Sequence, residues 1–174
     1  MRVGSGTWTL ANLTVVGNTA PLGGGLYLEG GTATLHHAIV WGNFAVDAAG
    51  TPLGAQLYIA NASASLPTVQ FCDIANAAND VVDDGVKING GDGFAAGQAA
   101  NLSANPLFAQ GPAGAYYLSQ TAAGQTQPSP CVDPVNANAL VAPLAAAAGF
   151  STYPTRTDGI GDAGTLDLGW HYGP

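Results

Sequence analysis

The sequence contains very few positively charged residues. Only three of its 174 residues are Lys or Arg (Arg2, Lys87 and Arg156), whereas eleven are Asp or Glu, and the net charge is -8. Nucleic-acid phosphates and anionic membrane surfaces are both bound by clusters of Lys and Arg, so the sequence excludes both partners. No apolar run is long enough to span a bilayer, so we also predict no membrane insertion.

Long charged side chains of any kind are scarce. Ten of the eleven acids are Asp, whereas 25 residues are Gly. Exposed helix faces normally carry Lys, Glu and Arg, so this composition argues against helices. The apolar stretches are short, rich in Val, Ile, Leu, Tyr and Thr, and separated by Gly, Asn and Pro, which is typical of strands and turns. We expect one β-rich domain.

The chain repeats itself every 25 residues. The stretch GTWTLANLTVVGNTA (6–20) aligns without a gap on GTATLHHAIVWGNFA (31–45), and eight positions are identical. A looser third copy spans 56–76 and carries a two-residue insertion. Each copy has room for two or three short strands, which fits one coil of a solenoid. We therefore predict an all-β, right-handed parallel β-helix of about three to five coils with an irregular C-terminal extension.

The repeat divides this single β-helix domain, 1–174, into four parts. They are repeated coils over 1–77, a polar loop excursion over 78–100, a closing coil over 101–133, and a C-terminal extension or cap over 134–174. The chain enters its first recognisable coil almost at once, without an amphipathic capping segment. We expect this open end to continue a longer β-helix or to be covered by another subunit, which by head-to-tail stacking would build a filament.

One asparagine recurs in each copy of the repeat, as Asn18, Asn43 and Asn76. Asparagine tolerates a positive φ at a turn, and stacked side-chain amides can bond to each other between coils. We therefore predict a turn ladder of these three residues.

The adjacent pair His36–His37 does not recur. These histidines align with Ala11 and Asn12 in the preceding copy. Adjacent residues on a strand point to opposite faces, so the pair chelates one ion only if the backbone turns between them, and a third ligand would still be needed. We predict structural or solvated histidines.

The coils lack the residues of a polysaccharide-cleaving β-helix. Such a lyase needs a carboxylate cluster with an Arg or Lys base on the same face, and no Arg or Lys lies between Arg2 and Lys87. Asp83 and Asp84 could be paired carboxylates of a hydrolase, but no partner motif accompanies them, so we interpret them as solvated loop acids. The sequence predicts no catalytic residue.

Aspartates in Gly-rich turns supply the oxygen ligands that calcium prefers. Two groups qualify, a tail group that we take as the candidate calcium site and a group in the excursion. The competing interpretation is that these side chains cap turns by accepting bonds from backbone N–H groups. No other cofactor is predicted. The tail group is Asp158, Asp162 and Asp167, and the excursion group is Asp80, Asp83, Asp84 and Asp92.

The C-terminal half carries an ordered set of motifs. They are NPLF (105–108), YYL (116–118), SPCVD (129–133) and the ending TYPTRTDGIGDAGTLDLGWHY (152–172). In this order they resemble the closing part of bacterial surface β-helix proteins with choice-of-anchor Q domains, which are related in style to polymorphic outer-membrane-repeat proteins. The resemblance covers roughly residues 69–172. It implies an exported protein, located extracellularly or at the cell surface, and it does not imply an enzymatic activity.

The two cysteines, Cys72 and Cys131, allow either one disulfide or two free buried thiols. Both fall where the resembled family tends to place cysteine, and an exported protein meets an oxidising environment, so the resemblance favours the disulfide.

These observations together predict a non-enzymatic structural or adhesive module of an exported bacterial surface protein. Its expected partners are copies of itself stacked end to end, or surface glycans. The alternative is a carbohydrate-binding or carbohydrate-active β-helix that depends on calcium.

Overall fold

The structure is a computed structural model. It describes residues 1–29, 31–46, 48–50, 53–60, 68–75, 101–134 and 149–173, together with the backbone of 81–83 and 86–87. These residues form 15 short β-strands and two 3₁₀ helices, η1 (Thr121–Ala123) and η2 (Phe150–Thr152), and none of them is α-helical. Within the described ranges, no helix has the length and apolarity to cross a membrane. The predicted all-β class is confirmed.

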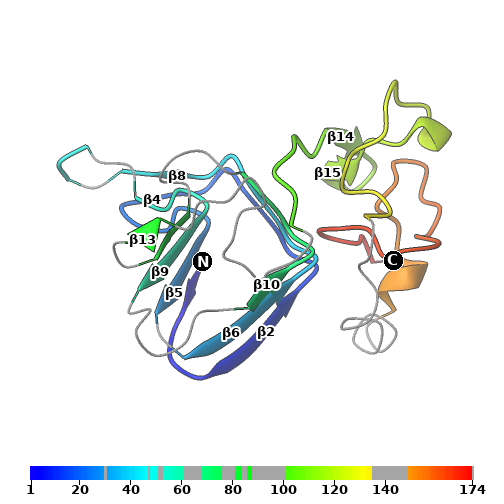
Figure 1. The fold of residues 1–174 in the computed structure, drawn as a ribbon. Coiled ribbons are helices and arrows are strands. Elements are labelled where there is room, and N and C mark those ends of the chain that lie inside the picture. Colours follow the sequence, from blue (N-terminus) through cyan, green and yellow to red (C-terminus); the bar gives the residue numbers. More distant parts are fainter. Residues whose placement is uncertain are drawn as a thin grey trace.

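Four parallel sheets form the sides of a β-helix, which Figure 1 shows with the tail beside one corner. The first sheet contains β1 (Arg2–Val3), β5 (Leu26–Glu29), β9 (Leu57–Ala60), β12 (Val81–Asp83) and the antiparallel β13 (Val86–Lys87). The second contains β2 (Thr7–Ala11), β6 (Thr32–His36) and β10 (Thr68–Gln70). The third contains β3 (Thr14–Val16), β7 (Ile39–Trp41) and β11 (Asp73–Ile74), and the fourth contains β4 (Thr19–Ala20) and β8 (Phe44–Ala45).

The 25-residue repeat of the sequence corresponds to the register in which the strands of these sheets pair. Thr7 pairs with Thr32, and Thr19 pairs with Phe44, each 25 positions along the chain. We call 1–25 coil 1, 26–56 coil 2 and 57–75 coil 3. Because each coil pairs in parallel with the next, the predicted parallel β-helix is confirmed.

The predicted loop excursion, 78–100, is not entirely loop. Its strand β12 pairs in parallel with β9 and begins a fourth layer, and the segment 88–100 lies outside the described residues. The chain then returns to the coils, where Leu102 forms a parallel bridge with Asp73. After this point β14 (Phe108–Gly111) and β15 (Gly114–Leu118) form an antiparallel hairpin.

Two apolar clusters hold these parts together. The first fills the inside of the coils and includes Leu26, Leu35, Val40 and Leu57, each at most 1% exposed. The second lies between the outside of the third sheet and the C-terminal segments, and its buried members are Ile39, Leu118, Cys131 and Leu168. The C-terminal segments therefore pack against the side of the β-helix.

Two members of the predicted ladder, Asn18 and Asn43, bond to each other, and the turn residues differ from the prediction. The Asn43 Oδ1 atom accepts bonds from the backbone N–H and the Nδ2 of Asn18, both at 3.0 Å. The next acceptor is Gln56 Oε1, 2.9 Å from Asn43 Nδ2, whereas Asn76 lies outside the described residues. Positive φ falls on Gly17 and Gly42, at 69° and 62°. Glycine takes the left-handed conformation, which leaves the next side chain to bond between coils.

Candidate functional site

The tail, residues 149–173, crosses the coils at the corner between the second and third sheets. The Gly169 N–H donates to the carbonyl of His37 in coil 2 at 2.7 Å, and the Trp170 N–H donates to Thr14 Oγ1 in coil 1 at 2.9 Å. The Leu168 N–H donates to the Cys131 carbonyl at 2.9 Å. These bonds fasten the tail across the coils.

The corner itself is a one-residue turn in each coil. Asn12, His37 and Phe71 occupy it in successive coils, with φ of 51°, 51° and 52°. The backbone therefore does turn at the histidine pair. The centroid of the His37 ring lies 5.7 Å from that of the Phe71 ring, and the two ring planes are tilted by 37°. His36 and His37 are 6% and 0% exposed, and neither belongs to a metal-competent group among the described residues.

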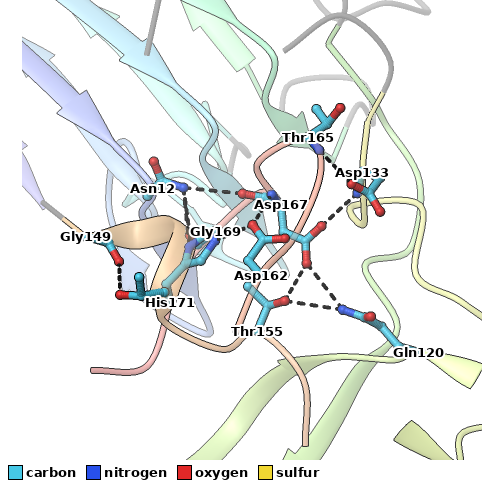
Figure 2. Close-up of polar contacts among 11 residues, drawn as sticks. Asn12, Gln120, Asp133, Gly149, Thr155, Asp162, Thr165, Asp167, Gly169 and His171 are labelled. Atoms are coloured by element: carbon cyan, nitrogen blue, oxygen red, sulfur yellow. Dashed lines mark hydrogen bonds and ion pairs between the residues drawn. The ribbon is translucent and has the colours of Figure 1, made fainter. Parts of the chain in front are cut away.

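A buried polar cluster lies between the tail and this corner, and Figure 2 shows its side chains converging on Asp167. Asp167 is 1% exposed, and its Oδ1 accepts a bond from the Asp133 N–H at 2.7 Å. Its Oδ2 accepts bonds from the Thr155 hydroxyl and from Gln120 Nε2. Burial, reinforced by the nearby Asp162 carboxylate, raises the pKa of Asp167 to about 6.

His171 forms the other side of the cluster. Its Nε2 lies 3.1 Å from Asp162 Oδ2, and the two side chains are 0% and 5% exposed. The same carboxylate oxygen accepts the Asp167 N–H at 2.9 Å. Asn12 Nδ2 reaches the tail carbonyls of Asp167 and Gly169 at 3.3 and 3.4 Å. The cluster thus bonds the first coil to a tail segment that is about 155 residues distant in the sequence.

Three carboxylates could hold a cation, and they are not the three that the sequence predicts. Ligand atoms of Asp133, Asp162 and Asp167 lie within 4.8 Å of one another. Asp158 is exposed and forms an ion pair with Arg156 at 2.6 Å, which lowers its pKa through the hydrogen bond from the guanidinium. Asp133 supplies the third carboxylate instead of Asp158. It lies beside the tail, where its Oδ1 accepts the Thr165 N–H at 2.9 Å.

Of the two alternatives for Cys72 and Cys131, the structure has the two free buried thiols and not the disulfide that the resemblance favours. Cys72 lies in the cluster inside the coils, whereas Cys131 lies in the cluster outside them. The neighbouring Asp73 points outward instead, and the Cys131 thiol donates to its Oδ2 at 3.1 Å. Burial raises the pKa of Asp73 to about 6 and that of Cys72 to about 12, and burial together with Asp73 raises the pKa of Cys131.

Neither thiol should react in the folded protein. The thiolate is the reactive form, and burial with a raised pKa suppresses it at both Cys72 and Cys131. Titration with an aromatic disulfide reagent should detect no thiol in buffer and both thiols in denaturant, without prior reduction. A reducing agent should leave the unfolding midpoint unchanged. Fewer than two thiols in the denatured, unreduced chain would reveal a disulfide.

The sequence marks three members of the cluster only as parts of the C-terminal motifs. Asp133, Thr155 and His171 come from segments that only the fold brings together. The excursion acids Asp80, Asp83, Asp84 and Asp92 cannot be compared, since their side chains lie outside the described residues.

No family model matches this chain, and no curated protein or solved structure matches it either.

Proposed function

We propose that this chain is a non-enzymatic structural or adhesive module of an exported bacterial surface protein. The observation that carries the proposal is the burial of the acid–base groups. Thr155, Asp167 and His171 are each at most 1% exposed, and their partners are other groups of the tail and the coils. A substrate could not reach these groups unless the tail detached, so we interpret them as structural groups that hold the tail against the coils.

The two arginines support the same interpretation. Arg2 forms an ion pair with Glu29 at 2.5 Å, and Arg156 forms one with Asp158. A lyase base needs a cation beside a carboxylate cluster on an open face. Within the described part of the chain, neither arginine forms an ion pair with Asp133, Asp162 or Asp167.

The aromatic stack on the first sheet offers little to a glycan. The Tyr27 ring stacks on the Tyr58 ring at 5.3 Å with a 6° interplanar angle, and the Arg2 guanidinium lies 5.5 Å over Tyr27. Tyr27 lies in the middle coil, so both its faces are covered by its neighbours in the stack. Sugars bind aromatic residues by their ring faces, so this column favours a structural role.

The exported, surface location rests on the resemblance of the C-terminal motifs. The landmarks NPLF, SPCVD and the final Gly–Trp–His–Tyr stretch all lie where the tail and hairpin pack on the coils. Their structural use agrees with a family whose shared residues build a scaffold. Partners are then expected to bind the outer faces or the ends of the β-helix.

Polysaccharide turnover tests the non-enzymatic function. The chain and its Asp167→Asn variant are incubated with a panel of acidic and neutral polysaccharides, with and without calcium, and reducing ends and unsaturated products are measured. We expect no product above the protein-free blank from either chain. Turnover by the unaltered chain that is lost in Asp167→Asn, while Glu29→Gln retains it, would assign catalysis to the buried cluster.

A further inference from the structure

A hydroxyl, a carboxylate and a side-chain amide meet where the tail packs against the segment that follows β15. The Thr155 hydroxyl donates a hydrogen bond to Asp167 Oδ2. Gln120 Nε2 donates to the same carboxylate oxygen and to Thr155 Oγ1, both at 3.3 Å (Figure 2). Each of the three side chains is therefore bonded to the other two. Two of them belong to the tail, whereas Gln120 lies just after β15.

These hydrogen bonds orient the Thr155 hydroxyl as a nucleophile. Its proton points to Asp167 Oδ2, and its oxygen accepts the Gln120 N–H, so an oxygen lone pair is directed at the amide group. The amide carbon, Cδ, is one covalent bond beyond Nε2, so a rotation of the Gln120 amide brings it to the hydroxyl oxygen. Threonine becomes nucleophilic when an adjacent base takes its proton, and fixed proximity lowers the barrier further.

The Asp167 carboxylate is held in the position of that base. Its Oδ1 accepts the Asp133 N–H at 2.7 Å, and the Asp167 N–H donates to Asp162 Oδ2 at 2.9 Å. These two bonds fix the carboxylate with Oδ2 turned toward the hydroxyl. Thr155 and Asp167 are 0% and 1% exposed. Burial disfavours the charged form of a carboxylate and so makes it a stronger base, and it keeps water away from the hydroxyl.

We propose that Thr155 and Gln120 react with each other and form an intramolecular ester that ties the tail to the rest of the chain. Asp167 accepts the hydroxyl proton while Thr155 Oγ1 bonds to Gln120 Cδ. The bond from Cδ to Nε2 then breaks, and Asp167 returns the proton to Nε2, which leaves as ammonia. The atoms balance without an oxidant or a further reactant, and the loss of ammonia to the solvent drives the exchange of an amide for an ester.

This inference rests on the proposed structural function and deepens it. Burial that excludes an external substrate does not prevent this reaction, because both reacting groups belong to the chain, and each chain reacts once. Among the described tail residues, the buried apolar side chains are only Leu166 and Leu168, and the other contacts that hold the tail are polar. A covalent link between positions 120 and 155 would close a loop and restrict the unfolded chain, as a disulfide does.

A second pair of the same residue types provides an internal control. Gln125 Nε2 donates to Thr157 Oγ1 at 2.9 Å, and this pair joins the same two segments. Within the described part of the chain, no carboxylate bonds to either of these two side chains. The Thr157 hydroxyl therefore has no base to take its proton, and we expect this pair to remain unreacted.

The intact mass of the full chain tests the proposal. The folded protein is incubated, denatured and measured by high-resolution mass spectrometry. We expect the unaltered chain to be lighter than its sequence by one ammonia, and Thr155→Val and Asp167→Asn to have their full sequence masses. The matched variant Thr157→Val should lose ammonia as the unaltered chain does. Proteolysis should yield two peptides joined through residues 120 and 155, and alkaline hydroxylamine should separate them, because it cleaves esters.

Three results would overturn the proposal. The first is a full-mass unaltered chain after incubation, which needs no variant to fold. The second is a loss of ammonia that maps elsewhere, such as to Asn89, where the Asn–Gly sequence can form a cyclic imide. The third is a loss of water, which would indicate an ester of Thr155 with Asp167 instead. None of these readouts involves polysaccharide turnover, so failure here is distinct from failure of the proposed function.

Discussion

Replacement of Asn43 by alanine is expected to lower the free energy of unfolding by about 3 kcal/mol. Asn43 is 5% exposed, and its side chain accepts two bonds from Asn18 and donates to the Val15 carbonyl at 2.8 Å and to Gln56 Oε1 at 2.9 Å. Alanine leaves the buried Gln56 amide and the Val15 carbonyl without this partner, and each such loss costs about 1 kcal/mol or more. Urea unfolding monitored by circular dichroism measures the change.

Asn18→Ala is the matched control for this variant. It removes the same side chain from the exposed end of the same ladder, while the backbone N–H of residue 18 still donates to Asn43 Oδ1. Its cost should stay below about 1 kcal/mol because water reaches the groups that it uncovers. Equal costs for the two variants would contradict the view that the inner ladder holds coils 1 and 2 together.

The protein is expected to lose stability as the pH rises from about 5 to about 8. Asp73 and Asp167 have folded pKa values of about 6 against 3.8 for the ordinary carboxyl, and burial is the first cause at both positions. The folded chain thus holds these protons more tightly than the unfolded chain. The stabilisation is fully present below the unfolded value and is lost as the pH rises through about 6. The two groups together should account for about 2 kcal/mol over this range.

The groups around Asp167 explain why its pKa is raised. Asp133 and Asp162 face Asp167 and oppose its ionisation, whereas the Thr155 hydroxyl and the Asp133 N–H favour the charged form without offsetting burial. His36 acts in the opposite direction, because desolvation lowers its pKa, so its stabilising contribution is present above about 6.5 and is lost as the pH falls. Variants of the two aspartates isolate their contribution from that of His36.

Chemical unfolding at several pH values tests this expectation. Asp73→Asn and Asp167→Asn should each flatten the slope, and Asp158→Asn, which alters an exposed ion pair, should leave the slope between pH 5 and 8 in place. Added calcium tests the cation-binding interpretation in the same assay. A cation held by Asp133, Asp162 and Asp167 would favour their charged forms, so calcium would raise the stability at about pH 8 and reverse the trend.

The coils were predictable because their information is local and periodic. The pairing of Thr7 with Thr32 follows directly from identical residues 25 positions apart. The turn at the corner could be predicted for only some of the coils. Asparagine often adopts a positive φ, as Asn12 does, but nothing in the sequence indicates the same conformation for Phe71. The stacked neighbours in the adjacent coils impose it, because a corner that turns in one coil must turn in the next.

The members of the polar cluster and the state of the two cysteines could not be predicted from residues that are close together in the sequence. Asp158 and Asp162 are near neighbours in the sequence, yet only Asp162 joins Asp167, and the third carboxylate comes from Asp133. The count of two cysteines leaves a disulfide and two free thiols open, and only the resemblance favours the disulfide, whereas the wall of the β-helix separates the apolar clusters of Cys72 and Cys131. Spacing along the chain does not reveal on which side of that wall a residue lies.

The sequence by itself determined that this chain is a stack of short parallel strands, because a period of 25 residues and alternating apolar positions leave one way to bury them. It also predicts that nucleic acids are not partners, because three Lys and Arg residues against eleven acids cannot form a phosphate-binding cluster. The tertiary structure alone decided that the tail returns to the first coils and that Asp167 and His171 are buried beneath it. These features depend on contacts between distant segments, which arise only when the folded chain buries their surfaces together.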